Sequence, residues 1–417
     1  MAARRSALQL AARVIERCLN ADESDGQASC LPCSCGNTAR YAGRRHKQVQ
    51  SALGRMDLKR AYYHCSHCQS GFAPRDRSFG IEHSSVSPAI LRMIGSVGAM
   101  VSFEEGSALL AELAGVTVET KQVERLAEQL GANIAADEKQ NAAPDDSQPL
   151  PSVLYLGLDG TGVPMRASEL AGRAGKQADG SAKTREVKLC TVWSAESRTA
   201  EGRPERDQDS VTYSAAIESA ATLDTDAVAS EFTRRVLREA NRRRFTDADQ
   251  TVVIGDGAAW IWRIAHELFP RATQIVDRFH VKQHLSELSK VLYGAQPAKA
   301  KSWAQRRHEE LDSGRFRDLL RAVRRHASQH EQARQCFQYL YGNRDRMRYP
   351  QFEAQGLCTS SGVVEAGCKV AIGTRLKRAG MHWTVTGANA IIALRCSRLS
   401  GRFQDYWERR LDSPRAA

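Results

Sequence analysis

The stretch VLYLGLDGTGVPM, residues 153–165, changes character halfway along its length. Residues 153–158 are apolar except for Gly157, and such a run is typical of a β-strand buried on both faces. Asp159 follows at once and precedes a Gly-Thr-Gly sequence. An ionised carboxylate at the end of a buried strand costs free energy unless a metal ion, a cation or backbone donors compensate it. The stretch therefore predicts a strand that ends in a functional carboxylate or, alternatively, in an acidic cap for the next turn.

A second stretch, QTVVIGDGAAWIWRIAHELFP at residues 250–270, has the same construction. Its apolar residues 252–254 predict a buried strand, Asp256 lies between two glycines, and the remainder predicts a helix. Asp159 and Asp256 are far apart in the chain, so they meet only if their strands are neighbours in one sheet. Two metal ions about 4 Å apart, as in phosphoryl transfer, need carboxylates brought together in this way.

The surrounding segments predict the rest of that sheet. Alternating residues predict a second strand in REVKLCTVWSA and a third in SVTYSAA, and a helix is expected at about 225–242. The segment ATQIVDRFHVKQHL repeats the apolar strand and turns into a helix through Asp277 and His280. Three meandering strands, a helix, a strand and a further helix-linked strand is the order of a ribonuclease-H-like α/β core.

A third carboxylate is normally required for two-metal chemistry, and Glu365 is the best candidate. It opens a predicted helix in SSGVVEAGCKVAIGTRLK and lies in a region otherwise free of acidic residues from Gln355 to Gly401. The alternative is that Glu365 only caps its helix, because acidic residues stabilise the first turn. Its isolation amid positive charge, downstream of the two strands, favours a functional role.

Five of the eleven cysteines lie within 39 residues, in CLPCSCG and CSHC. Two such knuckles about 30 residues apart predict a zinc ribbon with four thiolate ligands. The first knuckle has one cysteine too many, so Cys30/Cys33 competes with Cys33/Cys35; we prefer the latter because a glycine follows Cys35. Cys65 and Cys68 supply the second pair. Disulfides are the alternative, but six dispersed cysteines and no export signal favour a reducing cytosol.

The net charge of +12 is concentrated in the C-terminal third of the 417 residues. Residues 299–348 contain 13 Lys and Arg against 6 Asp and Glu, and residues 369–410 contain 9 against 2. This distribution predicts a polyanionic partner, with nucleic acid the leading candidate, although a solvated helical surface would look similar. No stretch approaches the roughly 18 apolar residues of a membrane span.

Changes of composition predict the following organisation. Residues 87–138 read as helices, and their helix, Gly-containing turn and helix fit a helix-turn-helix that binds DNA or, equally, an ordinary helical hairpin; the polar segment 139–151 reads as a linker. The full set of expected parts is an N-terminal helix (1–27), the zinc ribbon (28–80), the helical region (87–138), the linker (139–151), the first part of the catalytic core (152–291), a helical insertion (292–356), the final core helices (357–400) and a C-terminal tail (401–417).

Five motifs occur in an order that resembles the DDE transposases of bacterial insertion sequences, most of all the Kra branch, whose members pair a cysteine ribbon with this core. The motifs are LGLDGTGVP, VIGDGAAWIW, VDRFHVKQHL, GVVEAGCK and RLKRAGMHWT. The resemblance runs from about Ala28 to Arg398 and assigns the catalytic trio to Asp159, Asp256 and Glu365. It also implies an all-helical insertion before the glutamate and places Asp277 and His280 near the site.

The resemblance implies two-metal phosphoryl transfer on DNA with Mg²⁺ or Mn²⁺, in addition to Zn²⁺ in the ribbon. Expected partners are double-stranded DNA, as element ends and as target, and further copies of the chain; the expected location is the bacterial cytoplasm, at the nucleoid. Phosphate contacts are expected from Lys369, Arg375, Lys377 and Arg378. His382 and Trp383 are expected to hold a terminal nucleotide. For these two, a buried tryptophan with a hydrogen-bonded histidine is an equal alternative.

Two other functions share part of this pattern. A ribonuclease-H-like nuclease without strand transfer would have the same carboxylates but less need of a zinc ribbon and a basic helical insertion. A zinc-dependent DNA-binding regulator would explain the ribbon and the charge, but not three carboxylates in this order.

Overall fold

The computed structural model describes residues 2–82, 84–146, 149–175, 177, 180–220, 230–360 and 362–412. The chain divides into two compact units, one with the residues up to Ile134 and those from Phe403 onward, the other from Ala135 to Arg402. No helix among the described residues is long and apolar enough to cross a membrane. Residues 221–229, into which the helix expected at 225–242 extends, lie outside the described part.

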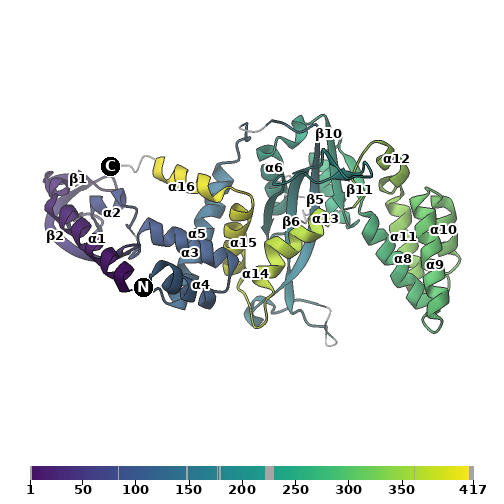
Figure 1. The fold of residues 1–417 in the computed structure, drawn as a ribbon, viewed down its shortest axis with the longest axis horizontal. Helices are drawn as coiled ribbons and strands as arrows, with labels where there is room; N and C mark the ends of the chain where they lie inside the picture. The colour runs from purple at the N-terminus through teal and green to yellow at the C-terminus, as the bar shows by residue number, and fades with distance from the viewer. Residues whose placement is uncertain are drawn as a thin grey trace. The chain divides into compact units, whose positions relative to one another are not determined.

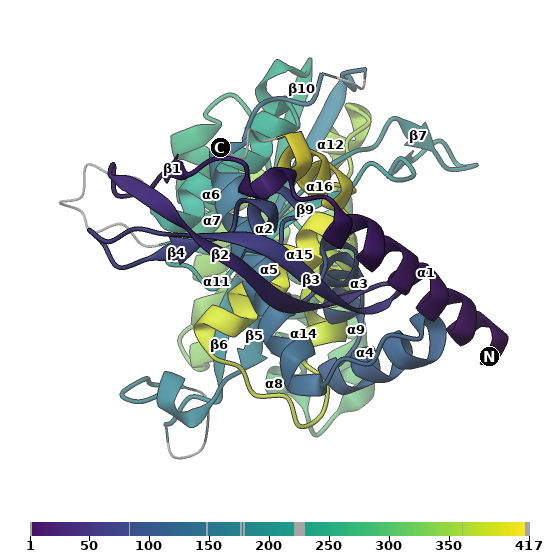
Figure 2. The same ribbon diagram turned by 90° about the vertical axis from the view of Figure 1, so that its left-hand side faces the viewer.

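The first unit begins with a helix and a small antiparallel sheet (Figure 2). The elements are α1 (Ala2–Ala21), η1 (Ser24–Gly26), β1 (Cys30–Pro32), β2 (Thr38–Ser51), β3 (Gly54–His64), β4 (Gly71–Phe72) and α2 (Pro74–Ser78). The strand order is β1-β2-β3-β4, and every neighbouring pair is antiparallel. Helix α1 packs on the long β2–β3 hairpin, where Ala12 is buried with Val49, Met56 and Leu58.

Helices complete the first unit. They are α3 (Pro88–Met100), α4 (Phe103–Leu109), the π-helical η2 (Leu110–Ala114), α5 (Thr120–Gln140), which continues into the second unit, and α16 (Phe403–Asp412). Ser102 and Glu105 form a reciprocal capping box that starts α4, and η2 ends at Gly115 with a left-handed φ of +71°. Residues 403–412, expected as part of a tail, are therefore helical.

The second unit is built on a five-stranded mixed sheet (Figure 1). Its strands are β5 (Val153–Pro164), β6 (Thr184–Ser194), β9 (Thr212–Ala216), β10 (Gln250–Gly255) and β11 (Thr273–Val276). The order is β11-β10-β5-β6-β9; β5, β6 and β9 form an antiparallel meander, whereas β10 is parallel to both β5 and β11. The short strands β7 (Ser197–Arg198) and β8 (Pro204–Glu205) form a separate hairpin between β6 and β9.

Helical segments accompany this sheet. They are α6 (Glu231–Arg242), α7 (Ala259–Leu268), α13 (Gly362–Gly367), the π-helical η6 (Cys368–Gly373), α14 (Thr374–Leu376) and α15 (Val385–Leu399), with 3₁₀ turns η3 (Ala167–Glu169) and η4 (Phe245–Asp247). Residues of α6, α7 and α13 belong to the hydrophobic core of the sheet, and α15 packs against β9. The buried guanidinium of Arg395 in α15 donates to the Val370 carbonyl oxygen at 3.0 Å and to Thr374 Oγ1 at 2.7 Å. These hydrogen bonds therefore stabilise η6, the π-helical turn after α13, in which a backbone carbonyl lacks its usual helical N–H donor.

The chain between β11 and α13 is helical. Its elements are α8 (Arg278–Tyr293), α9 (Pro297–Asp312), α10 (Phe316–Arg324), α11 (Glu331–Gly342), η5 (Arg344–Arg346) and α12 (Tyr349–Ala354). Helices α8 to α11 pack against one another in a closed group, drawn in green in Figure 1. The helical insertion expected at 292–356 thus shares its packing with α8, which starts directly after the sheet.

Candidate functional site

Asp159 and Asp256 occupy equivalent places on two adjacent parallel strands. In the register of β10 and β5, Gly255 lies opposite Leu158, so the next residue of each strand is an aspartate. Residues at matching positions of parallel neighbours point to the same face of the sheet. The structure therefore places both half-buried carboxylates side by side where the pairing of β5 with β10 ends, on one face of the sheet.

The surroundings of Asp159 disfavour its charge. Burial raises the pKa of this carboxyl, and the nearby charge of Asp256 raises it further. Hydrogen bonds from the Cys368 thiol and from the Gly160 N–H, at 2.6 Å, oppose that rise, as does the charge of His280. A cation bound between the two carboxylates would remove this cost, and oxygen ligands suit Mg²⁺ or Mn²⁺.

Helix α13 brings Glu365 to the same face of the sheet. Gly157 points to the same side as Asp159, and a Cβ at Gly157 would come within 2.1 Å of Val364 Cγ2, so α13 rests on the bare backbone there. Glu365 follows Val364 and is exposed. Within the described residues, only the cysteine cluster has three or more metal-ligand atoms within 4.8 Å of one another, so Glu365 and the two aspartates do not form so tight a group.

Asp277 and His280 lie where the next helix begins. The Asp277 N–H donates to the Gly255 carbonyl at 2.8 Å, and its side chain accepts from the Phe279 N–H at 2.7 Å. Through this hydrogen bond Asp277 acts as the N-cap of α8, beside the end of β10, and it is only 2% exposed. His280, one turn into α8, lies close enough to influence the charge of Asp159.

Four of the six expected DNA-binding residues are exposed: Lys369, Lys377, Arg378 and His382. Lys377 has the most informative position, because its ammonium group donates to the hydroxyl of Thr161, two residues beyond Asp159 on β5. A phosphate near the carboxylate pair would therefore lie within reach of this cation.

The other two expected DNA-binding residues are buried. Arg375 is 0% exposed, and its guanidinium lies 5.3 Å from the ring centre of Trp383. The Trp383 indole N–H donates to the Leu376 carbonyl at 3.0 Å, and its backbone bridges to Met165 after β5. Burial takes Arg375 out of the surface expected to contact phosphate. For Trp383, burial favours the alternative of a buried tryptophan over a surface that stacks on a nucleotide.

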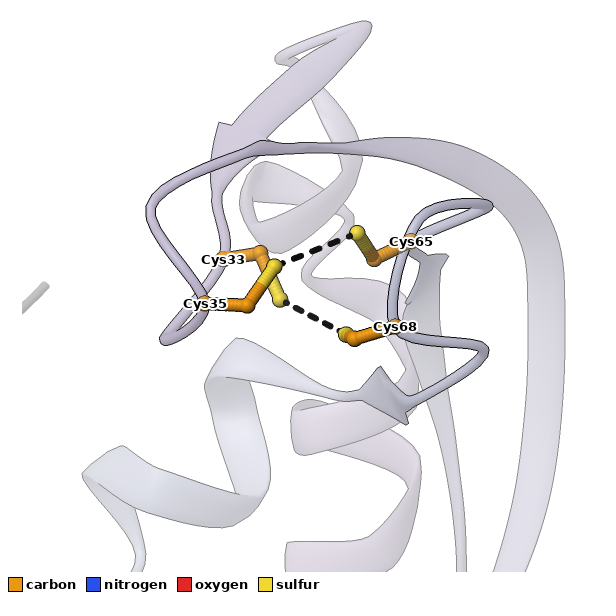
Figure 3. Close-up of side chains that lie close together, drawn as sticks. All are labelled: Cys33, Cys35, Cys65 and Cys68. Atoms are coloured by element: carbon orange, nitrogen blue, oxygen red, sulfur yellow. Dashed lines mark hydrogen bonds between the residues drawn. The ribbon is translucent and has the colours of Figure 1, made fainter.

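In the first unit, Cys33, Cys35, Cys65 and Cys68 meet as the preferred reading of the knuckles predicted (Figure 3). All four sulfurs lie within 4.8 Å of one another, with Cys33 and Cys68 3.6 Å apart and Cys35 and Cys65 3.7 Å apart. Cys30 is exposed in β1 opposite Arg40 and does not join them. Four convergent thiols in two knuckles fit a structural zinc ion.

The knuckle loops prepare the sulfurs for metal binding. The Cys33 N–H donates to the Asn37 carbonyl at 2.7 Å, and Gly36 has a left-handed φ of +82° that closes this turn. The Cys35 N–H and, to a smaller extent, the neighbouring thiols lower the pKa of Cys33 to about 6. A thiolate is the form that binds zinc, so the first knuckle favours the liganding state of Cys33. The backbone N–H groups that would lower the pKa of Cys65 are outweighed by burial and by the hydrogen bonds with the Cys35 and Cys68 thiols, so this pKa is raised.

One feature of the ribbon went unnoticed at the level of the sequence. Residues 28–80 contain nine Lys and Arg against two Asp and Glu, an excess as large as in either C-terminal region. Arg40, Arg45 and Arg55 of the β2–β3 hairpin are exposed, and Arg45 lies 3.6 Å above the ring centre of Tyr62. The charge count alone could have found this surface, which was obscured because acidic residues elsewhere in the N-terminal part balance it.

Comparisons with known proteins give a family but no named relative. No curated protein matches the chain. One similar solved structure is the Drosophila P element transposase strand transfer complex, with 10% sequence identity, coverage of 82% of this chain and 87% of that chain, and a TM-score of 0.27. A likeness this low carries no argument. The family model described as "Uncharacterised protein family (UPF0236)" matches residues 38–410. The chain therefore belongs to the uncharacterised protein family UPF0236.

Proposed function

We propose that the chain is a DDE-type transposase, which binds the ends of an insertion sequence and cleaves and joins DNA by two-metal phosphoryl transfer. The observation that carries the proposal is the paired placement of Asp159 and Asp256 on adjacent parallel strands, with the Glu365 helix on the same face. The strand order β11-β10-β5-β6-β9 supports a ribonuclease-H-like core, as does an inserted helical group before the glutamate.

The residues suggest a division of labour. Asp159, Asp256 and Glu365 would hold two Mg²⁺ or Mn²⁺ ions, which when bound activate a water or a DNA 3′-hydroxyl for in-line attack and stabilise the leaving oxygen. Lys377, beside Asp159, would hold a phosphate of the cleaved strand, with Lys369, Arg378 and His382 as further exposed contacts. Asp277 would set the start of α8 and His280 the local charge.

The direct test uses purified full-length protein, the DNA that flanks its gene, Mg²⁺ and a target plasmid, with nicks mapped at nucleotide resolution. The proposal predicts defined 3′-hydroxyl ends at the element boundaries and their covalent joining to the target. Cleavage without joining would identify a nuclease. Specific binding with no cleavage under any metal condition would identify a DNA-binding regulator.

Basic side chains on the helical insertion should supply a salt-dependent part of the DNA affinity. Arg317, Arg321 and Arg324 recur on one face of α10, and Arg325 follows them; all four are exposed. Replacing Arg317, Arg324 and Arg325 with glutamine should weaken binding and reduce the slope of log affinity against log salt by up to about three units, because counterion release scales with phosphates contacted. Fluorescence anisotropy across a salt series measures both quantities.

A matched triple variant separates this surface from net charge alone. Arg334, Arg344 and Arg348 are also exposed on the insertion, but each already pairs with Glu331 or Asp345. Their replacement removes the same formal charge and should change the slope by less than about one unit. Equal slopes for the two triple variants would show that the arginines of α10 contribute no more than their net charge.

A further inference from the structure

The turn that carries Asp256 is held by a side chain from the helical insertion. Tyr339 lies on α11, and its hydroxyl donates to the backbone carbonyl of Asp256 at 2.8 Å, across 83 residues of sequence. The Asp256 side chain accepts from the Ala258 N–H at 2.9 Å, which orders the same turn locally. The peptide bond between Asp256 and Gly257 is therefore held by a side chain from outside the sheet.

The ring of Tyr339 also fits against the turn. Gly257 has a φ of +100°, and a Cβ at this position would lie 2.5 Å from Tyr339 Cε2, so the ring occupies the space that a side chain would need. The ring of His284 from α8 also packs against it, with 4.7 Å between the two ring centroids.

We propose that Tyr339 is a positioning residue, whose hydroxyl fixes the Asp256 peptide so that the carboxylate faces the metal site shared with Asp159. The proposal rests on the function proposed above, because it takes these aspartates as metal ligands. The hydrogen bond from Tyr339 would link the basic helical insertion directly to the proposed metal site. A partner that orients a ligand commonly changes metal affinity by about 10- to 100-fold when it is removed.

Tyr349 provides a matched control. It lies on α12, is fully buried, and its hydroxyl donates to the backbone carbonyl of Val276 at 2.9 Å. Both tyrosines thus reach from the insertion to a carbonyl at the end of a strand in the same sheet. The difference is that Tyr349 contacts the residue before the helix cap Asp277, whereas Tyr339 contacts a proposed metal ligand.

The experiment compares Tyr339→Phe, Tyr349→Phe and Asp159→Asn in the full-length, zinc-loaded protein. Mn²⁺ binding is followed by the electron paramagnetic resonance signal of free Mn²⁺, and thermal unfolding and DNA anisotropy are measured alongside. Tyr339→Phe should weaken Mn²⁺ binding about tenfold with little change in DNA affinity. Tyr349→Phe should leave Mn²⁺ binding unchanged, even if it lowers the melting temperature. High Mn²⁺ should restore cleavage to Tyr339→Phe but not to Asp159→Asn.

The possible results separate the two proposals. If Asp159→Asn weakens Mn²⁺ binding and Tyr339→Phe does not, the metal site stands and the role of Tyr339 is overturned. Equal weakening by Tyr339→Phe and Tyr349→Phe would also overturn it, because packing alone would then explain the effect. If Asp159→Asn binds Mn²⁺ as the wild type does, the metal site falls, and the role of Tyr339 falls with it.

Discussion

The substitution Asp159→Asn is expected to abolish DNA cleavage and to leave DNA binding largely intact. The amide keeps the shape of the side chain but removes the charge that the proposed metal ions need. Removing one member of a catalytic unit commonly lowers the rate by about four orders of magnitude or more. The same loss is expected for Asp256→Asn and Glu365→Gln if the three carboxylates act together.

Cleavage of a labelled element end in Mg²⁺ measures the effect, and anisotropy with the same DNA measures binding. Glu196→Gln is a suitable control, since Glu196 is exposed at the other end of β5, just before its first residue, where it accepts from the Ser152 N–H at 2.6 Å. This control should cleave at the wild-type rate. Full cleavage by Asp159→Asn would refute the site, and a loss of folding in this variant would make Asp159 a structural cap.

Loss of zinc should have the second large effect, on the folding of the ribbon. We expect about one zinc ion per chain, held by the four clustered cysteines. Among the described residues, the packed core around them contains five buried residues, and two of these, Cys33 and Cys65, are proposed zinc ligands. Binding free energies of about 10–16 kcal/mol for structural zinc are coupled to folding in small zinc domains. Chelation or Cys65→Ser should therefore unfold the ribbon.

Elemental analysis of reduced protein measures the zinc content, and limited proteolysis reports where the chain becomes accessible. Cleavage should appear within residues 28–80 while fragments of the second unit persist. Cys30→Ser is the control and should retain zinc, because Cys30 lies outside the cluster. Protein without zinc would end the prediction, and zinc loss in Cys30→Ser but not in Cys35→Ser would assign the first knuckle to Cys30 and Cys33.

The parts of the fold that the sequence predicted are those with strong local patterns. The apolar run before Asp159 and the alternation in residues 185–195 identify β5 and β6, and repetition of an apolar run before Asp256 identifies β10. The mixed α/β architecture and the cluster of Cys33, Cys35, Cys65 and Cys68 are confirmed. Cysteine spacing is informative because each short knuckle holds its own two cysteines close together, so only the meeting of the two knuckles depends on a distant contact.

Other features depended on contacts between distant segments. Arg375 belongs to a basic segment of the kind that binds DNA. It is buried because Trp383 packs beside Met165, a contact that no local pattern reveals. The same holds for Tyr339, whose partner is 83 residues away. The π-helical turn after α13 depends on Arg395, a residue that reads simply as part of a basic helix. Burial of a charged side chain and irregular helix geometry are both determined by tertiary packing, which local sequence patterns do not reveal.

The position of α13 late in the chain has a consequence for synthesis on the ribosome. The ribbon, both aspartate-bearing strands and the whole helical insertion precede Glu365. If all three carboxylates are needed, the nascent polypeptide has the basic surfaces of the ribbon and the insertion before it can cut, whereas the proposed phosphate contacts Lys369, Lys377, Arg378 and His382 follow Glu365 in the chain. On the proposed function, a product terminated after the insertion would lack both the third carboxylate and these cations. Truncation would therefore remove the chemistry together with part of the DNA-binding surface rather than leave a weaker enzyme.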